Sequence, residues 1–163
     1  MCLLRILGAL CLVFAGTAAG CLQSRKLRLR RDRAQDFLQF LSAAKAEISC
    51  TAAPVQDIVE HHGRKLDFLA PYFTAIEAGE PFTQAWQKAS SDSSLTPQER
   101  VLLRNFGEGF GATDMQGQLA HCTLYEELTR QELEESQKTY QKDGKLYRML
   151  GVCGGLIFAL VLL

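Results

Sequence analysis

The side chains best able to do chemistry in this sequence are its histidines and cysteines, but their spacing is poor for a shared ligand. His61 and His62 are adjacent, as are His121 and Cys122. Neighbouring residues on a helix point about 100° apart, so neither pair is placed to chelate one metal ion. No CxxC pair is present to supply two thiolates. We therefore expect no metal site and no cofactor.

Glutamates cluster in the last third of the chain, where paired carboxylates would be one basis for acid/base catalysis. The cluster comprises Glu126, Glu127, Glu132, Glu134 and Glu135. A catalytic carboxylic acid needs burial to shift its pKa, whereas this stretch has few apolar residues and predicts a solvated helix face. No Ser-His-Asp or Cys-His arrangement stands out, so we expect no enzyme and no small-molecule substrate. A membrane-tethered hydrolase that uses residues such as His62 or Glu127 is a competing hypothesis.

The sequence GEGFG at residues 107–111 has the glycine content of a phosphate-binding loop. It lacks the Gly-Lys-Ser/Thr ending of such a loop, and no predicted strand precedes it. A corner between two helices explains these glycines better.

The elements that must position these residues are predicted to be helices. Apolar residues at alternating three- and four-residue steps predict one buried face of a first domain helix; they are Ala34, Phe37, Leu41, Ala44 and Ile48. Thr51 is expected to cap a short second helix that has Pro54 near its start. Pro71 falls inside the next apolar pattern and is expected to divide it.

Two helix starts are predicted further along the chain. Thr96 and Glu99 form a capping box around Pro97, and Asp114 is placed to cap the last helix. That helix meets no proline between residues 119 and 147 and is expected to run directly into the apolar C-terminal segment. No stretch of four or more residues alternates like a strand. The predicted fold class is all-α: a small helical bundle of about five to six helices with a long last helix, flanked by N- and C-terminal transmembrane segments.

Both ends of the chain are apolar, since residues 6–24 and 149–163 contain no charged side chain. Such runs are typical of membrane-embedded helices. The predicted organisation is an N-terminal transmembrane anchor at 1–24, a basic juxtamembrane segment at 25–33, a helical domain at 34–141, and a basic flank with a C-terminal transmembrane segment at 142–163. The last apolar run has 15 residues and reaches about 22 Å at ~1.5 Å per residue, against about 30 Å of hydrocarbon. A re-entrant or interfacial helix is therefore the alternative there.

Positive charge flanks both apolar ends on the side of the domain. The residues of this membrane-surface basic cluster are Arg25, Lys26, Arg28, Arg30, Arg31, Arg33, Lys142, Lys145 and Arg148. Positive flanks are retained in the cytoplasm and attract anionic lipid headgroups, so we expect the domain to be cytoplasmic. Residues 34–141 carry eight basic and 16 acidic side chains, a net charge of −8, which argues against binding to nucleic acid.

The N-terminus admits another interpretation. Residues 5–21 also have the shape of a secretory signal, and Ala18, Ala19 and Gly20 before Cys21 approach a lipoprotein cleavage pattern. The alternative function is then an extracytoplasmic lipoprotein binding module anchored at Cys21. The basic residues that follow argue for the uncleaved anchor instead.

The order and spacing of several short motifs resemble the stage III sporulation protein AB family of endospore-forming bacteria. The motifs are LGAL at 7–10, AEI at 46–48, AW at 85–86, LRNFGEGFG at 103–111 followed by Asp114 and Gln118, and KLYRMLGVCGGL at 145–156. The resemblance covers essentially the whole chain. Gly109 departs from it, because a larger residue is usual there, and this glycine is expected to loosen the end of its helix.

The resemblance implies a domain similar to the cytoplasmic domains of the F protein of type II secretion systems. It also implies a platform component of the complex between mother cell and forespore, in the mother-cell membrane, with the other complex proteins and a secretion-type ATPase as partners. No catalytic residue comes with the family. The matched tract expected to form a partner contact is Phe106, Gly107, Glu108, Gly111, Asp114 and Gln118. A corner that these residues specify between two helices is the competing explanation.

Overall fold

The structure, a computed structural model, describes the backbone of residues 2–51 and 53–162 and the side chains of residues 25–51, 53–138 and 149. The chain divides into two units, Arg33–Glu132 and the pair of segments Met1–Asp32 and Leu133–Leu163. All elements in the described residues are helical: α1 (Cys2–Thr51), α2 (Val55–His62), α3 (Ala70–Glu77), α4 (Phe82–Ser90), α5 (Pro97–Gly109) and α6 (Met115–Leu162), with 3₁₀ turns at Gly63–Lys65 and Asp67–Leu69. The predicted all-α bundle and its long last helix are confirmed.

The 33–132 unit has one hydrophobic core to which every helix contributes. Its predicted face on α1 is confirmed, because the five predicted residues are buried: Ala34, Phe37, Leu41, Ala44 and Ile48. Phe106 of α5 is fully buried, and its ring contacts those of Phe37, Phe110 and Tyr125. Aromatic side chains bury large apolar areas and gain further from edge-to-face contacts. Phe106 therefore joins α1, α5 and α6 at the centre of the unit.

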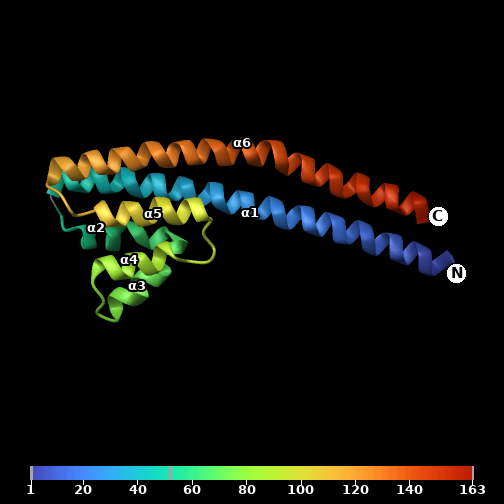
Figure 1. The fold of residues 1–163 in the computed structure, drawn as a ribbon, viewed down its shortest axis with the longest axis horizontal. Coiled ribbons are helices and arrows are strands. Elements are labelled where there is room, and N and C mark those ends of the chain that lie inside the picture. Colours follow the sequence, from blue (N-terminus) through green and yellow to red (C-terminus); the bar gives the residue numbers. More distant parts are fainter. Residues whose placement is uncertain (1, 52, 163) are drawn as a thin grey trace. The chain divides into compact units, whose positions relative to one another are not determined.

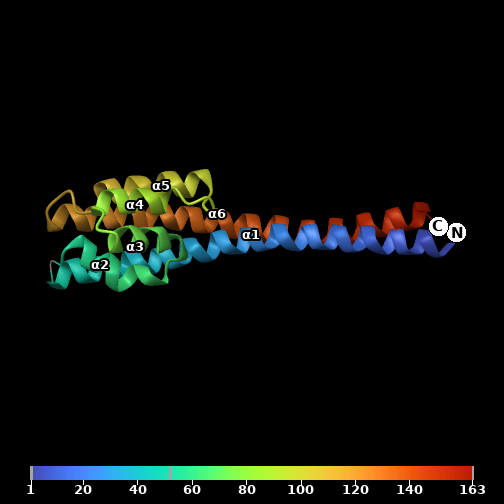
Figure 2. The same ribbon diagram turned by 90° about the horizontal axis from the view of Figure 1, so that it is seen from below.

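The short helices follow one another across this unit. Figures 1 and 2 both show α4 between α3 and α5, in agreement with its contacts to these two helices. On the side of α1 and α6, Lys45 Nζ donates to Glu126 Oε2 at 2.8 Å. The ion pair joins residues 81 positions apart and so fixes the register of the two long helices in this unit.

One predicted boundary is wrong. Thr51 caps no helix: α1 continues through it, and its hydroxyl donates to the carbonyl of Glu47 at 2.9 Å. Such bonding to the preceding turn is the alternative open to threonine on a helix, and Pro54 is the residue before α2. The division expected near Pro71 is present, because the apolar pattern is split into the 3₁₀ turn Asp67–Leu69 and helix α3. Pro71 lies in the first turn of α3, where a missing N–H costs no hydrogen bond.

The other unit consists of the remaining parts of α1 and α6. The basic segment at 25–33 is continuous with α1, and Gly144 does not interrupt α6. Within the described part of the chain, no helix combines the length and apolarity that a membrane crossing requires. The predicted transmembrane segments fall on residues 1–24 and 149–163, and apart from that of Met149 their side chains lie outside the described residues.

Candidate functional site

The N-terminal end of α5 is held by reciprocal hydrogen bonds. The hydroxyl of Thr96 accepts from the Glu99 N–H at 3.2 Å, and the Thr96 N–H donates to Glu99 Oε2 at 2.6 Å. Pro97 occupies the first turn, where it displaces no hydrogen bond. The capping box predicted from the sequence is confirmed.

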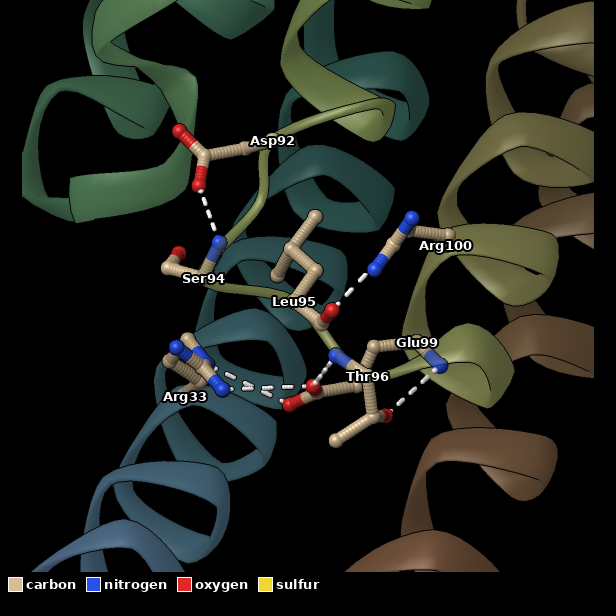
Figure 3. Close-up of polar contacts among 7 residues, drawn as sticks. All are labelled: Arg33, Asp92, Ser94, Leu95, Thr96, Glu99 and Arg100. Carbon is tan, nitrogen blue, oxygen red and sulfur yellow. Dashed lines mark hydrogen bonds and ion pairs between the residues drawn. The ribbon is translucent and has the colours of Figure 1, made fainter.

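Glu99 also receives Arg33 from α1, a contact that the sequence does not reveal. Arg33 Nε and Nη2 donate to the two carboxylate oxygens of Glu99, each at 3.2 Å, as Figure 3 shows. The side chains of Arg33 and Glu99 are only 18% and 10% exposed. Bidentate pairing of a guanidinium with a carboxylate is strong and geometrically specific, so it fixes the start of α5 against α1.

The loop before α5 adds two more bonds at this end. Asp92 accepts from the Ser94 N–H at 2.7 Å, and Arg100 Nε donates to the carbonyl of Leu95 at 3.1 Å (Figure 3). Hydrogen bonds from the Ser94 side chain and backbone, aided by the charges of Arg33 and Arg100, hold the pKa of Asp92 below its ordinary value. The charges of Arg33 and Arg100 thus act on Asp92 as well as on their own bonded partners at this end of α5.

The C-terminal end of α5 is held by close packing instead. A Cβ atom at Gly107 would lie 2.0 Å from Trp86 Cδ1, so any side chain there would displace the indole. Trp86 is buried, and its Nε1 donates to the carbonyl of Leu103 at 2.7 Å. The absence of a side chain at Gly107 therefore allows α4 to approach α5.

Gly109 makes the same kind of room for α6. A Cβ atom at Gly109 would lie 2.3 Å from His121 Cε1. His121 stacks on Phe106 and donates from Nε2 to its carbonyl at 2.9 Å. Gly109 thus seats His121 against α5, and α5 remains helical through Gly109.

The turn into α6 completes the corner. Gly111 has φ +89°, a conformation that favours glycine. Asp114 Oδ1 accepts from the Gly117 N–H at 2.9 Å, as expected of the predicted cap, and the Gln118 amide donates to the carbonyl of Thr113 at 3.1 Å. The interpretation of the tract as a corner between two helices agrees with all these contacts.

Burial divides the predicted contact tract. Phe106 and Gly107 are buried and belong to the core, so they present no surface to a partner. Glu108, Gly111 and Asp114 are exposed, and Gln118 is half-buried. A partner contact therefore remains a prediction for the last four residues only.

The residues of the membrane-surface basic cluster also differ in their exposure and in their partners. Arg25, Lys26 and Arg28 are exposed, and Arg30 is half-buried. Arg31 and Arg28 lie 2.6 Å and 3.7 Å from the carboxylate oxygens of Asp32. Arg33 belongs to the 33–132 unit, where its side chain pairs with Glu99. Lys142, Lys145 and Arg148 have side chains outside the described residues.

The adjacent histidines tie α2 to α1. His62 Nε2 donates to Glu47 Oε2 at 2.6 Å, and His61 Nδ1 lies 3.3 Å from Glu47 Oε1. Burial raises the pKa of Glu47, but the hydrogen bonds to the two imidazoles outweigh it and hold the pKa below its ordinary value. His62 thus pairs with Glu47 and not with Glu127, whose side chain is exposed.

The described residues include no group of three or more His, Cys, Asp or Glu side chains that could hold a metal ion. Of the two cysteines whose side chains are described, Cys50 is exposed and Cys122 is buried, and both are free thiols. Burial raises the pKa of Cys122 to about 11. A thiol with so high a pKa is a poor nucleophile at neutral pH.

Comparison with known proteins gives one finding. A family model described as stage III sporulation protein AB matches residues 5–163, which is nearly the whole chain. No curated protein matches the chain, and no solved structure matches it.

Proposed function

Because the chain belongs to the stage III sporulation protein AB family, and so has a role in sporulation, we propose that it is a non-enzymatic membrane platform of the complex linking mother cell and forespore. In this proposal the helical 33–132 unit lies in the mother-cell cytoplasm. The apolar segments at 6–24 and 149–163 hold it at the mother-cell membrane. A secretion-type ATPase of the same complex is the partner that docks on it.

The observation that carries this proposal is the extent of the family match. It includes the helical unit and the whole of both apolar segments, 6–24 and 149–163. Two uncharged ends with basic residues on the domain side favour anchoring with the domain in the cytoplasm. The exposed Arg25, Lys26 and Arg28 fit contact with anionic headgroups, because they follow the first apolar segment directly.

The bonding of Glu99, Trp86 and His121 fits a structural role for these three groups. Both carboxylate oxygens of Glu99 are occupied by Arg33 and Thr96. Trp86 and His121 donate to helix carbonyls. Groups committed in this way position helices, and a catalytic group needs a free polar atom that faces a substrate.

Co-purification from sporulating cells tests the proposal. The full chain carries an affinity tag and is extracted in mild detergent, and the secretion-type ATPase of the complex is quantified in the purified fraction. We expect ATPase recovery with the tagged chain and none with an unrelated membrane protein that carries the same tag.

Two results would contradict the proposal. One is recovery of the chain without ATPase under conditions that preserve the other complex proteins. The other is acyl labelling that disappears in Cys21→Ser, which would favour the extracytoplasmic lipoprotein module.

A further inference from the structure

The large hydrophobic side chains that are exposed in the 33–132 unit are confined to two helices. The large hydrophobic residues exposed there are Val101 (48%), Met115 (45%), Leu124 (55%) and Leu128 (39%). All four lie on α5 or α6, and among the described residues α2, α3 and α4 carry none. Single exposed apolar residues are ordinary, but their concentration marks an interaction surface.

Leu124 and Leu128 form a stripe on α6. Residues four apart lie on the same side of a helix. The core side of α6 is formed by Cys122, Tyr125 and Thr129, which are buried. The two leucines therefore project from the part of α6 that the core leaves uncovered.

Helix α5 runs antiparallel to α6 along this stripe. His121, early in α6, bonds to Phe106, late in α5. At the other end, Leu102 and Thr129 line one hollow of about 30 Å³. Val101 precedes Leu102 and Leu128 precedes Thr129, so in these antiparallel helices Val101 and Leu128 lie about 3 Å apart along the helix axes, which is within one turn.

The exposed charges near these apolar residues are of both signs. Arg104 and Glu108 on α5 and Glu127 on α6 are exposed, and Arg104 and Glu108 line one hollow together with Trp86 of α4. The neighbouring Glu126 is paired with both Lys45 and Arg130. The whole 33–132 unit carries eight basic and 14 acidic side chains, a net charge of −6. This net negative charge favours a positively charged ligand.

We propose that the α5–α6 face, defined by Val101, Glu108, Leu124, Glu127 and Leu128, binds a basic amphipathic helix of a partner protein. Apolar side chains of that helix cover the leucine stripe, and its lysines or arginines meet Glu127 and Glu108. A second copy of this face would bring carboxylates against carboxylates, and an anionic bilayer would repel them. This inference rests on the proposed function and adds to it the docking face and the partner's chemistry.

Site-specific photo-crosslinking in sporulating cells tests the proposal. A photoreactive residue replaces Leu124 in the full chain, and in a control it replaces Gln84, which is exposed on α4. Adducts are identified by mass spectrometry. We expect the Leu124 probe to crosslink to a segment of another protein that contains lysines or arginines on one side of an apolar helix, and the Gln84 probe not to reach that segment.

Charge reversal provides the matched comparison. Glu108→Lys with Glu127→Lys is expected to lower the yield of the Leu124 adduct by about tenfold or more, because like charges then face each other. Asp67→Lys with Glu77→Lys reverses two exposed carboxylates elsewhere in the unit and should leave the yield unchanged. Trp86 fluorescence verifies that each variant is folded. Crosslinking of the chain that carries only the Leu124 probe tests the proposal by itself, even if a charge-reversed variant does not fold.

An adduct with a second copy, with lipid, or with a segment that lacks basic residues would overturn the proposal, as would no adduct above the Gln84 control. Co-purification of the ATPase separates this failure from failure of the proposed function. If the ATPase is still recovered while the Leu124 probe finds no basic segment, the platform proposal stands and the α5–α6 face is not its docking site.

Discussion

The two ends of α5 are positioned by opposite means. At the N-terminal end, Thr96, Glu99 and Arg33 supply charges and hydrogen bonds that cross from α1 to α5. At the C-terminal end, Gly107 and Gly109 supply no side chain at all, and Trp86 and His121 fill the space. One helix is thus fixed by attraction at its start and by steric fit at its end.

The two ends of α5 are therefore expected to respond differently to substitution. A lost hydrogen bond at the capping box leaves the rest of the helix in place, so its cost is local. A side chain added at Gly107 pushes on a buried indole, and close-packed interiors absorb such displacement poorly. We therefore expect the C-terminal end to tolerate substitution less than the N-terminal end.

The largest effect is expected from Gly107→Val. Its Cβ atom alone would meet Trp86 Cδ1 at 2.0 Å, and moving the indole would also break its bond to Leu103. We expect a loss of about 3 kcal/mol or more in the free energy of unfolding. Urea unfolding of the full chain in detergent, followed by the fluorescence of its single tryptophan, measures this loss. Asn105→Ala, at an exposed position of the same helix, is the control and should be nearly neutral.

Glu99→Ala should have the next largest effect. It leaves the mostly buried Arg33 guanidinium unpaired and removes the acceptor of the Thr96 N–H. Breaking a buried ion pair costs about 3–5 kcal/mol, and partial exposure reduces this to about 2–3 kcal/mol. Glu99→Gln keeps an acceptor for Thr96 and should lose less in the same unfolding experiment. A stability of Glu99→Gln equal to that of the native chain would mean that the charge of Glu99 adds nothing.

Thr96→Ala removes only the hydroxyl half of the capping box. The expected loss is about 1 kcal/mol, because Glu99 retains its bonds to Arg33 and to the Thr96 N–H. Thr96→Ser preserves the acceptor and should be close to the native chain. A loss from Thr96→Ala as large as that from Gly107→Val would contradict the contrast between the two ends of α5.

The smallest expected effect is a pH dependence of stability that arises from Asp92, close to the N-terminal end of α5. The pKa of Asp92 is lowered in the folded chain, so its carboxylate stabilises the fold at neutral pH, and this contribution disappears as the pH falls through the lowered pKa. Asp92→Asn should therefore be less stable than the native chain at neutral pH. The difference should vanish in acid, and a difference that is constant across the titration would contradict this role of the charge.

The sequence reveals what is local in this structure and misses what is distant. The capping box lies within four consecutive residues, and the buried face of α1 follows from its apolar period, so both were predicted correctly. The Arg33–Glu99 pair joins positions 66 residues apart, and no local pattern contains it. Arg33 was accordingly assigned to the membrane surface with the other basic residues.

The glycine tract shows the same limit. Its composition indicates a corner, but the reason for Gly107 is Trp86 on α4 and the reason for Gly109 is His121 on α6. Thr51 shows that a local preference can also mislead. Threonine often caps helices, but here its hydroxyl bonds to the carbonyl of Glu47 and the residue belongs to α1. Tertiary packing decides such cases, and propensity does not.

The most direct test of the central claim, that the helical unit faces the mother-cell cytoplasm as a membrane-held platform, is labelling of one engineered thiol. The native cysteines are replaced by serine, and Ser93→Cys places a probe in the exposed loop between α4 and α5. A membrane-impermeant maleimide is then added to protoplasts of sporulating cells. We predict that the thiol is protected until the membrane is permeabilised, whereas labelling in intact protoplasts would put the unit outside the cell and contradict the claim.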